Sequence, residues 1–173
     1  VDSYEWEACF ERNKDILVDT VRPVQTTIFT GFFERLVSFM DMENALVAMI
    51  DEDQVDADKA LFDRLADIYE KIIDNMVTRM GIAAVWLHDD WGSQNSTFLS
   101  RGMFQDFFLE AYKTIYGRYK ERGVKYIIHH SDSYAKTLVP DMIEMGIDVW
   151  QGCMWSHDIP ELIQKYGGKI SFM

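Results

Sequence analysis

The chain has 173 residues, 48% of them hydrophobic and 14% aromatic, which is enough to bury the core of one globular domain over residues 1–173. Its 17 basic and 29 acidic residues give a net charge of −12, which argues against nucleic acid or an anionic membrane as a partner. There is no apolar run of about 18 residues, no visible signal peptide and no pattern of cysteines typical of a disulfide framework, so we expect a cytoplasmic protein.

Helical periodicity and glycine or proline stops divide the chain into helices and short apolar strands. Pro23 ends the first expected helix, and Asp56 and Ser100 are expected N-caps. The expected helices cover about 1–22, 32–40, 42–51, 57–80, 101–122, 134–145 and 158–166. The expected strands cover 23–29, 83–88, 124–129, 147–152 and 169–173. From residue 81 onward strands and helices alternate, which predicts right-handed crossovers and a parallel sheet.

The number of strands bears on the type of α/β fold. A closed (β/α)₈ barrel typically needs about 250 residues, and only five strands are expected here. The pattern therefore indicates either an open sheet or part of a TIM-type barrel that is incomplete at both ends, and the abrupt ends of the pattern favour the barrel. A bare sheet edge invites pairing with another chain. If these residues were the whole protein, a homodimer that completes the barrel would be expected.

Two successive strands end in clusters of ionisable residues. These residues are His88, Asp89 and Asp90 after the first strand, and His129, His130 and Asp132 after the second. Because ligands gather at the carboxyl ends of parallel strands, the two clusters predict a functional site. Neighbouring residues of a strand point to opposite faces, so only one histidine of the adjacent pair is expected at the barrel mouth.

Several segments resemble the uroporphyrinogen decarboxylase superfamily, most closely its branch of corrinoid-linked methyltransferases. The similar segments are GFFERLVSFMDMENALVAMIDE (31–52), HDDWGSQ (88–94), HHSD (129–132), LVPDMIEMGIDVWQG (138–152) and KYGGKISF (165–172). The resemblance implies a (β/α)₈ TIM barrel of which this chain covers the central and later units. It also implies methyl transfer between a small substrate and methylcobalamin that a corrinoid protein carries. Two alternatives stay open: decarboxylation of uroporphyrinogen III in porphyrin biosynthesis, which needs no cofactor, and ligand binding without catalysis.

The resemblance also points to individual residues. Methyltransferases of this superfamily commonly carry an H-x-C-G motif whose His and Cys help to bind zinc. Here His130 matches, whereas Asp132 stands in the Cys position and Ser133 in the Gly position. The expected zinc ligands are therefore His130 and Asp132, with Cys153 as a substitute thiolate.

We expect Asp89, Asp90 and His130 to be catalytic. The residues expected to contact the substrate are Trp91, Gln94, Tyr134 and Gln151.

Each of these residues also has a purely structural interpretation. One of the two aspartates could cap a turn, and Trp91 could belong to the core. His130 and Asp132 could form a proton relay or a helix-capping pair instead of a metal site. Cys153 could be a small buried hydrophobic residue, as free cysteines often are.

Overall fold

Five parallel strands form one sheet in the computed structural model, which describes residues 1–17 and 21–173. The strands are β1 (Gln25–Ile28), β2 (Ala84–His88), β3 (Tyr126–His130), β4 (Val149–Gln151) and β5 (Ser171–Phe172), and each pairs with the next in the sequence. Consecutive parallel strands placed side by side are the arrangement found in a (β/α)₈ barrel. The chain is thus a five-stranded part of a TIM-type barrel, as the sequence predicted.

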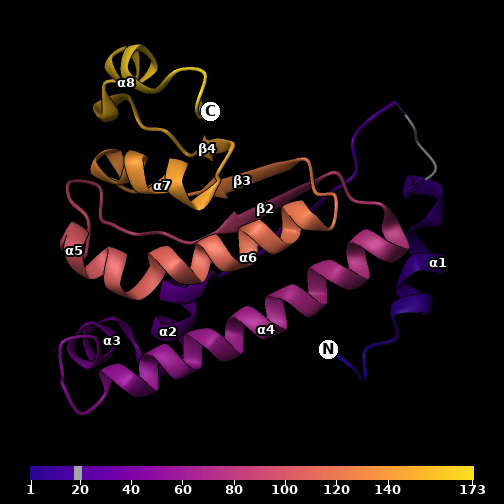
Figure 1. Cartoon of the computed structure of the whole chain (residues 1–173), viewed down its shortest axis with the longest axis horizontal. Coiled ribbons are helices and arrows are strands. Elements are labelled where there is room, and N and C mark those ends of the chain that lie inside the picture. The colour runs from indigo at the N-terminus through magenta and orange to yellow at the C-terminus, as the bar shows by residue number, and fades with distance from the viewer. Residues whose placement is uncertain (18–20) are drawn as a thin grey trace.

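Helices connect the strands, and α4, α6 and α7 lie side by side along the sheet (Figure 1). The α-helices are α1 (Trp6–Leu17), α2 (Phe32–Met40), α3 (Met42–Ala48), α4 (Val55–Met80), α5 (Arg101–Phe104), α6 (Glu110–Glu121), α7 (Val139–Met145) and α8 (Ile159–Tyr166). The π-helical turn η1 (Gln105–Leu109) joins α5 to α6, and η2 (Lys136–Leu138) and η3 (Trp155–His157) are 3₁₀ turns. Within the described residues, no helix is both long enough and apolar enough to cross a membrane.

Local signals account for most helix ends. The Ser100 hydroxyl accepts a hydrogen bond from the Met103 N–H at 3.3 Å, so the predicted N-cap is confirmed. Gly81 adopts the left-handed conformation, with φ of +60°, and ends α4. The prediction for Asp56 was wrong, because α4 begins at Val55 and Asp56 lies inside its first turn. Of the expected first helix, residues 18–20 lie outside the described part of the chain.

The two faces of the sheet differ in burial. Side chains that alternate along the strands, such as Val85, Leu87, Ile127 and Trp150, are fully buried in the core. Their neighbours in the strands, such as Trp86, are partly exposed and point to the opposite face, which corresponds to the inside of a barrel. Residues on this second face at the carboxyl ends of the strands therefore point toward the barrel mouth.

Candidate functional site

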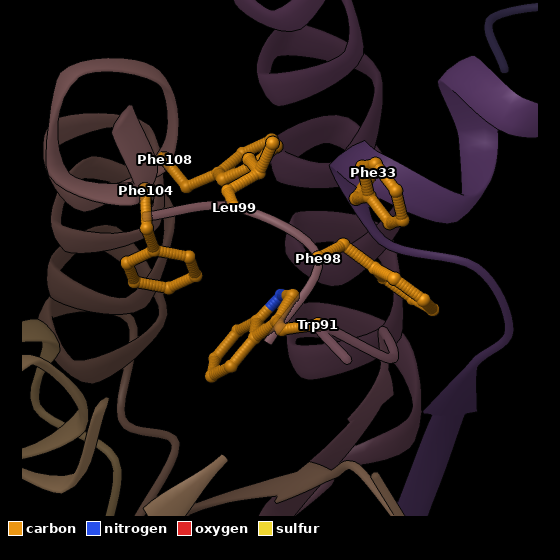
Figure 2. A pocket seen from close by; sticks show the side chains of 6 residues that line it. All are labelled: Phe33, Trp91, Phe98, Leu99, Phe104 and Phe108. Atoms are coloured by element: carbon orange, nitrogen blue, oxygen red, sulfur yellow. The ribbon is translucent and has the colours of Figure 1, made fainter. Parts of the chain in front are cut away.

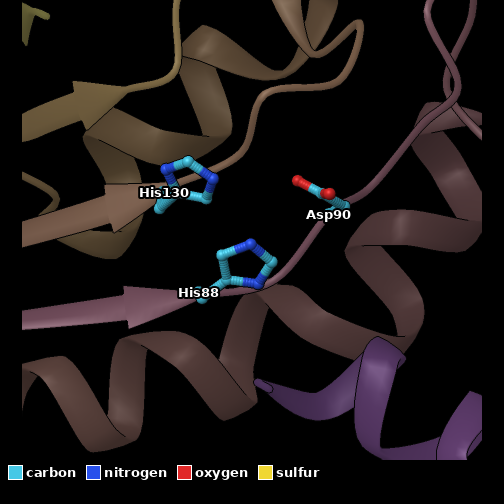
Figure 3. Close-up of side chains that lie close together, drawn as sticks. All are labelled: His88, Asp90 and His130. Atoms are coloured by element: carbon cyan, nitrogen blue, oxygen red, sulfur yellow. The ribbon is translucent and has the colours of Figure 1, made fainter. Parts of the chain in front are cut away.

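The carboxyl ends of β2 and β3 bring together His88, Asp90 and His130. His88 and His130 are the last residues of their strands and are paired in the ladder. Their rings stack with centroids 4.4 Å apart and planes inclined by 21°. Asp90 lies in the loop after β2, and its carboxylate points back toward both rings (Figure 3). Each of the three residues offers a potential ligand atom, and these atoms lie within 4.8 Å of one another.

Both imidazole rings of this cluster are held through Nδ1. His88 Nδ1 lies 2.7 Å from a carboxylate oxygen of Glu34, and His130 Nδ1 contacts the side-chain oxygen of Gln151. Gln151 pairs with His130 in the ladder between β3 and β4. In the part of the chain that the structure describes, no hydrogen bond engages Nε2 of either ring. The second nitrogen of each ring is therefore available to a ligand at the mouth.

Asp90 occupies a crowded, acidic position. Its carboxylate accepts a hydrogen bond from the Asp132 N–H at 3.1 Å, which ties the loops after β2 and β3 together. Burial raises the pKa of the Asp90 carboxyl, and the nearby carboxylates of Asp132 and Glu34 raise it further, whereas His88 and His130 lower it. A positive charge at the mouth would offset this repulsion.

Asp89, expected among the catalytic residues, lies in the scaffold behind the mouth. Its side chain is fully buried and accepts hydrogen bonds from the N–H groups of Phe33 (3.1 Å) and Glu34 (2.8 Å) at the start of α2. It also accepts from Trp91 Nε1 at 3.1 Å and from the Tyr112 hydroxyl at 2.5 Å. Burial raises the pKa of this carboxyl to about 7. Asp89 thus fixes the first turn of α2, which carries Glu34 to the mouth.

Trp91, which was expected to contact the substrate, lies in the core and is only 3% exposed. Its ring stacks on His129 at 3.9 Å and packs against Phe104. Together with other apolar side chains it lines a small pocket under the loop after β2 (Figure 2). Trp91 is part of the core, which was the alternative interpretation of this residue.

His129 faces the core, on the side opposite to His130. Its Nε2–H donates to the Asp89 carbonyl at 3.1 Å, and its Nδ1 accepts from the Tyr116 hydroxyl at 2.9 Å. Burial lowers the pKa of His129 to about 3, so its ring is neutral at ordinary pH. The structure thus leaves His130, the other histidine of the pair, at the mouth.

The expected ligand set of His130, Asp132 and Cys153 is not brought together. Among the described residues, the group that could hold a metal contains His130 with His88 and Asp90 instead. The Cys153 thiol donates to the Trp150 carbonyl at 3.4 Å, and burial raises its pKa to about 11, which disfavours the thiolate that a metal needs. The Asp132 backbone hydrogen-bonds to Asp90, while the residue itself is exposed.

The remaining expected substrate contacts surround the mouth. Gln94 is exposed, and its amide lies 3.5 Å from the Asp132 carbonyl. Tyr134 is half-buried, with its ring 5.8 Å from that of His157. Gln151 is half-buried and held against His130. Gln151 thus contacts His130 of the candidate cluster directly. Gln94 reaches the cluster through Asp132, which bonds to Asp90, whereas the Tyr134 ring packs against another loop.

Sequence reasoning missed the roles of His88 and Glu34 in this arrangement. His88 ends its strand just as His130 ends the next one, so matching the two strand ends in register would have placed both rings on one face. Glu34 had no such signal, because it comes from α2 and reaches His88 only through the packing that Asp89 provides.

A parallel sheet in sequential order, with its polar cluster at the carboxyl ends of the strands, defines this chain as part of a TIM-barrel protein of the kind that carries its active site at that mouth. The particular family follows from the sequence match. Residues 29–173 match the family described as Uroporphyrinogen decarboxylase (URO-D), and the chain belongs to that family. Neither the curated proteins nor the solved structures contain a significant match.

Proposed function

We propose that this chain catalyses methyl transfer between a small substrate at the barrel mouth and methylcobalamin carried by a corrinoid protein. The observation that carries the proposal is the cluster of His88, Asp90 and His130 at the carboxyl ends of β2 and β3. Such chemistry needs an activated nucleophile, usually a thiol or hydroxyl whose pKa a metal lowers. The cluster offers nitrogen and oxygen ligands for such a metal, as well as groups that can accept a proton.

The residues around the cluster would orient the substrate. Glu34 and Gln151 hold the two imidazole rings through Nδ1, so Nε2 of each ring remains for a ligand. The exposed amide of Gln94 lies at the rim and can donate to a polar substrate group. Asp90 and His130 are the proposed reactive groups, because both are partly exposed at the mouth.

The charge of the mouth favours methyl transfer over uroporphyrinogen decarboxylation. Uroporphyrinogen carries many carboxylates and requires basic partners, whereas the mouth presents Glu34, Asp90 and Asp132. The nearby basic residues are engaged elsewhere: Arg101 pairs with Asp141 at 2.7 Å, and Lys136 pairs with Glu161 at 2.6 Å. A polycarboxylate substrate would therefore meet repulsion at the site.

The test is a demethylation assay. The full chain is mixed with methylcobalamin and a panel of small thiols, and loss of the methylcobalamin absorbance is followed. His130→Ala should lower the rate by about 100-fold or more, in the range of a lost acid–base group. Lys136→Ala, which removes a surface ion pair away from the cluster, is the matched control and should leave the rate unchanged. Consumption of uroporphyrinogen without any demethylation would overturn the proposal.

A further inference from the structure

The geometry points to a zinc site formed by Nε2 of His88, Nε2 of His130 and a carboxylate oxygen of Asp90. This ligand set contains no cysteine, unlike the set that the sequence resemblance implied. The inference deepens the proposed function and rests on it for the catalytic use of the metal. The binding site itself rests on three observations about the described residues, which concern ligand placement, the support of the rings and charge.

The first observation is that the backbone already holds the ligands together. His88 and His130 are paired in a parallel ladder, so their separation is set by the spacing of neighbouring strands. Asp90 is tied to the loop after β3 through the Asp132 N–H. One candidate ligand atom from each residue lies within 4.8 Å of the other two, whereas ligands about 2.0–2.2 Å from one tetrahedral zinc ion lie about 3.3–3.6 Å from each other. The two stacked rings must therefore turn toward each other, and Asp90 must move closer, for the three side chains to bind one ion.

The second observation is the support behind each ring. Histidine ligands almost always donate their other N–H to a carboxylate or carbonyl oxygen, which fixes the tautomer and the ring orientation. His88 Nδ1 faces the Glu34 carboxylate, and His130 Nδ1 faces the Gln151 amide oxygen. Because both partners are acceptor oxygens, each contact places a hydrogen on Nδ1, and Nε2 of each ring has no hydrogen bond among the described residues. Two neighbouring histidines that had no binding role and were only exposed to solvent would not be expected to share this support.

The third observation is the local charge. Three carboxylates, from Glu34, Asp90 and Asp132, lie close enough to influence one another, and Asp90 is half-buried among them. A divalent cation between the histidines and Asp90 would add positive charge at the point where the carboxylates converge.

The chemistry of the ligands selects the metal class. Two imidazole nitrogens and one carboxylate oxygen form a known type of catalytic zinc site, in which three protein ligands leave a fourth position for water or substrate. A set of oxygen ligands alone would suit magnesium or calcium, whereas imidazole favours zinc and its first-row neighbours. The open position would face the barrel mouth, where the proposed substrate binds.

The experiment measures metal binding and not turnover. The full chain is stripped with a chelator, then titrated with Zn²⁺ by calorimetry and with Co²⁺ by visible absorption, whose band intensity reports the coordination number. One equivalent of each metal should bind. His88→Ala, His130→Ala and Asp90→Asn should each weaken binding by more than about 100-fold, and Glu34→Gln by about 10–100-fold as a supporting residue.

The matched control is Cys153→Ser, which alters a ligand of the alternative set and should bind both metals as the unaltered chain does. Circular dichroism of each variant shows whether it is folded. Loss of binding in Cys153→Ser, retention in His88→Ala, or no binding by the folded chain would each overturn the site. Zinc binding without demethylation would instead overturn the proposed function alone, and demethylation by metal-free protein would overturn the catalytic use of the metal but not the binding site.

Discussion

Gly31 stands where α2 approaches the buried Asp89 most closely, so a single methyl group there should be costly. A Cβ at this position would lie 2.4 Å from the Tyr112 hydroxyl and 2.7 Å from both Cβ and Cγ of Asp89. Ordinary contacts between such atoms are about 3.5–4.0 Å, so the overlap is roughly 1 Å. Asp89 and Tyr112 are both fully buried and hydrogen-bonded to each other, so neither can move away without breaking that bond.

We therefore expect Gly31→Ala to lower the free energy of unfolding by about 2–3 kcal/mol, within the range for overpacked cores. For a chain of this size, that loss lowers the melting temperature by about 4–12 °C. The matched control is Gly117→Ala, because Gly117 lies inside α6 and a Cβ there meets no atom within 4 Å. The control should gain about 0.5–1 kcal/mol from its better helix propensity. Equal melting temperatures for the two variants, measured by circular dichroism, would refute the reasoning.

Three further predictions concern buried titratable groups. The pKa of Asp89 is raised to about 7, so between about pH 4 and 7 the folded state holds a proton that the unfolded state releases. The free energy of unfolding should therefore fall as the pH rises through this range. Urea denaturation of Asp89→Asn should not show this fall. The pKa of His129 is lowered to about 3, so between about pH 6.5 and 3 the unfolded state binds a proton at this residue that the folded state does not. The free energy of unfolding should therefore fall as the pH drops through this range. His129→Gln should flatten this pH dependence, and an unchanged pH dependence would contradict the lowered pKa of His129. The Cys153 thiol, with its pKa raised to about 11, should react with iodoacetamide at pH 7 far more slowly than free cysteine, and an equal rate would show that it is not shielded.

The fold could be predicted from the sequence because its signals are local. Apolar runs that follow glycine predicted the last four strands, and their alternation with helices predicted a parallel sheet in a barrel-type order. Helix starts were less certain, as Asp56 shows, because several polar residues in a row can each serve as a cap.

The candidate site could be predicted only in part, because its membership depends on contacts between distant segments. The sequence pointed to the ends of β2 and β3, and His130 and Asp90 do face the mouth there. It could not say that Cys153 bonds to its own loop, that the Trp91 ring turns into the core, or that α2 brings Glu34 to His88. Those outcomes follow from packing, which no short motif encodes.

The two doublets Asp89–Asp90 and His129–His130 each supply one residue to the buried core and one to the candidate site. In each doublet one residue faces the core and the other faces the mouth. The inner pair is joined directly, since His129 Nε2 donates to the Asp89 carbonyl, and Asp89 in turn holds the first turn of α2. The outer pair, Asp90 and His130, would bind the ligand. Because the backbone links each inner residue to its outer neighbour, any movement of the buried network displaces Asp90 and His130 as well. The polar core of this barrel segment is therefore the element that sets the geometry of its mouth.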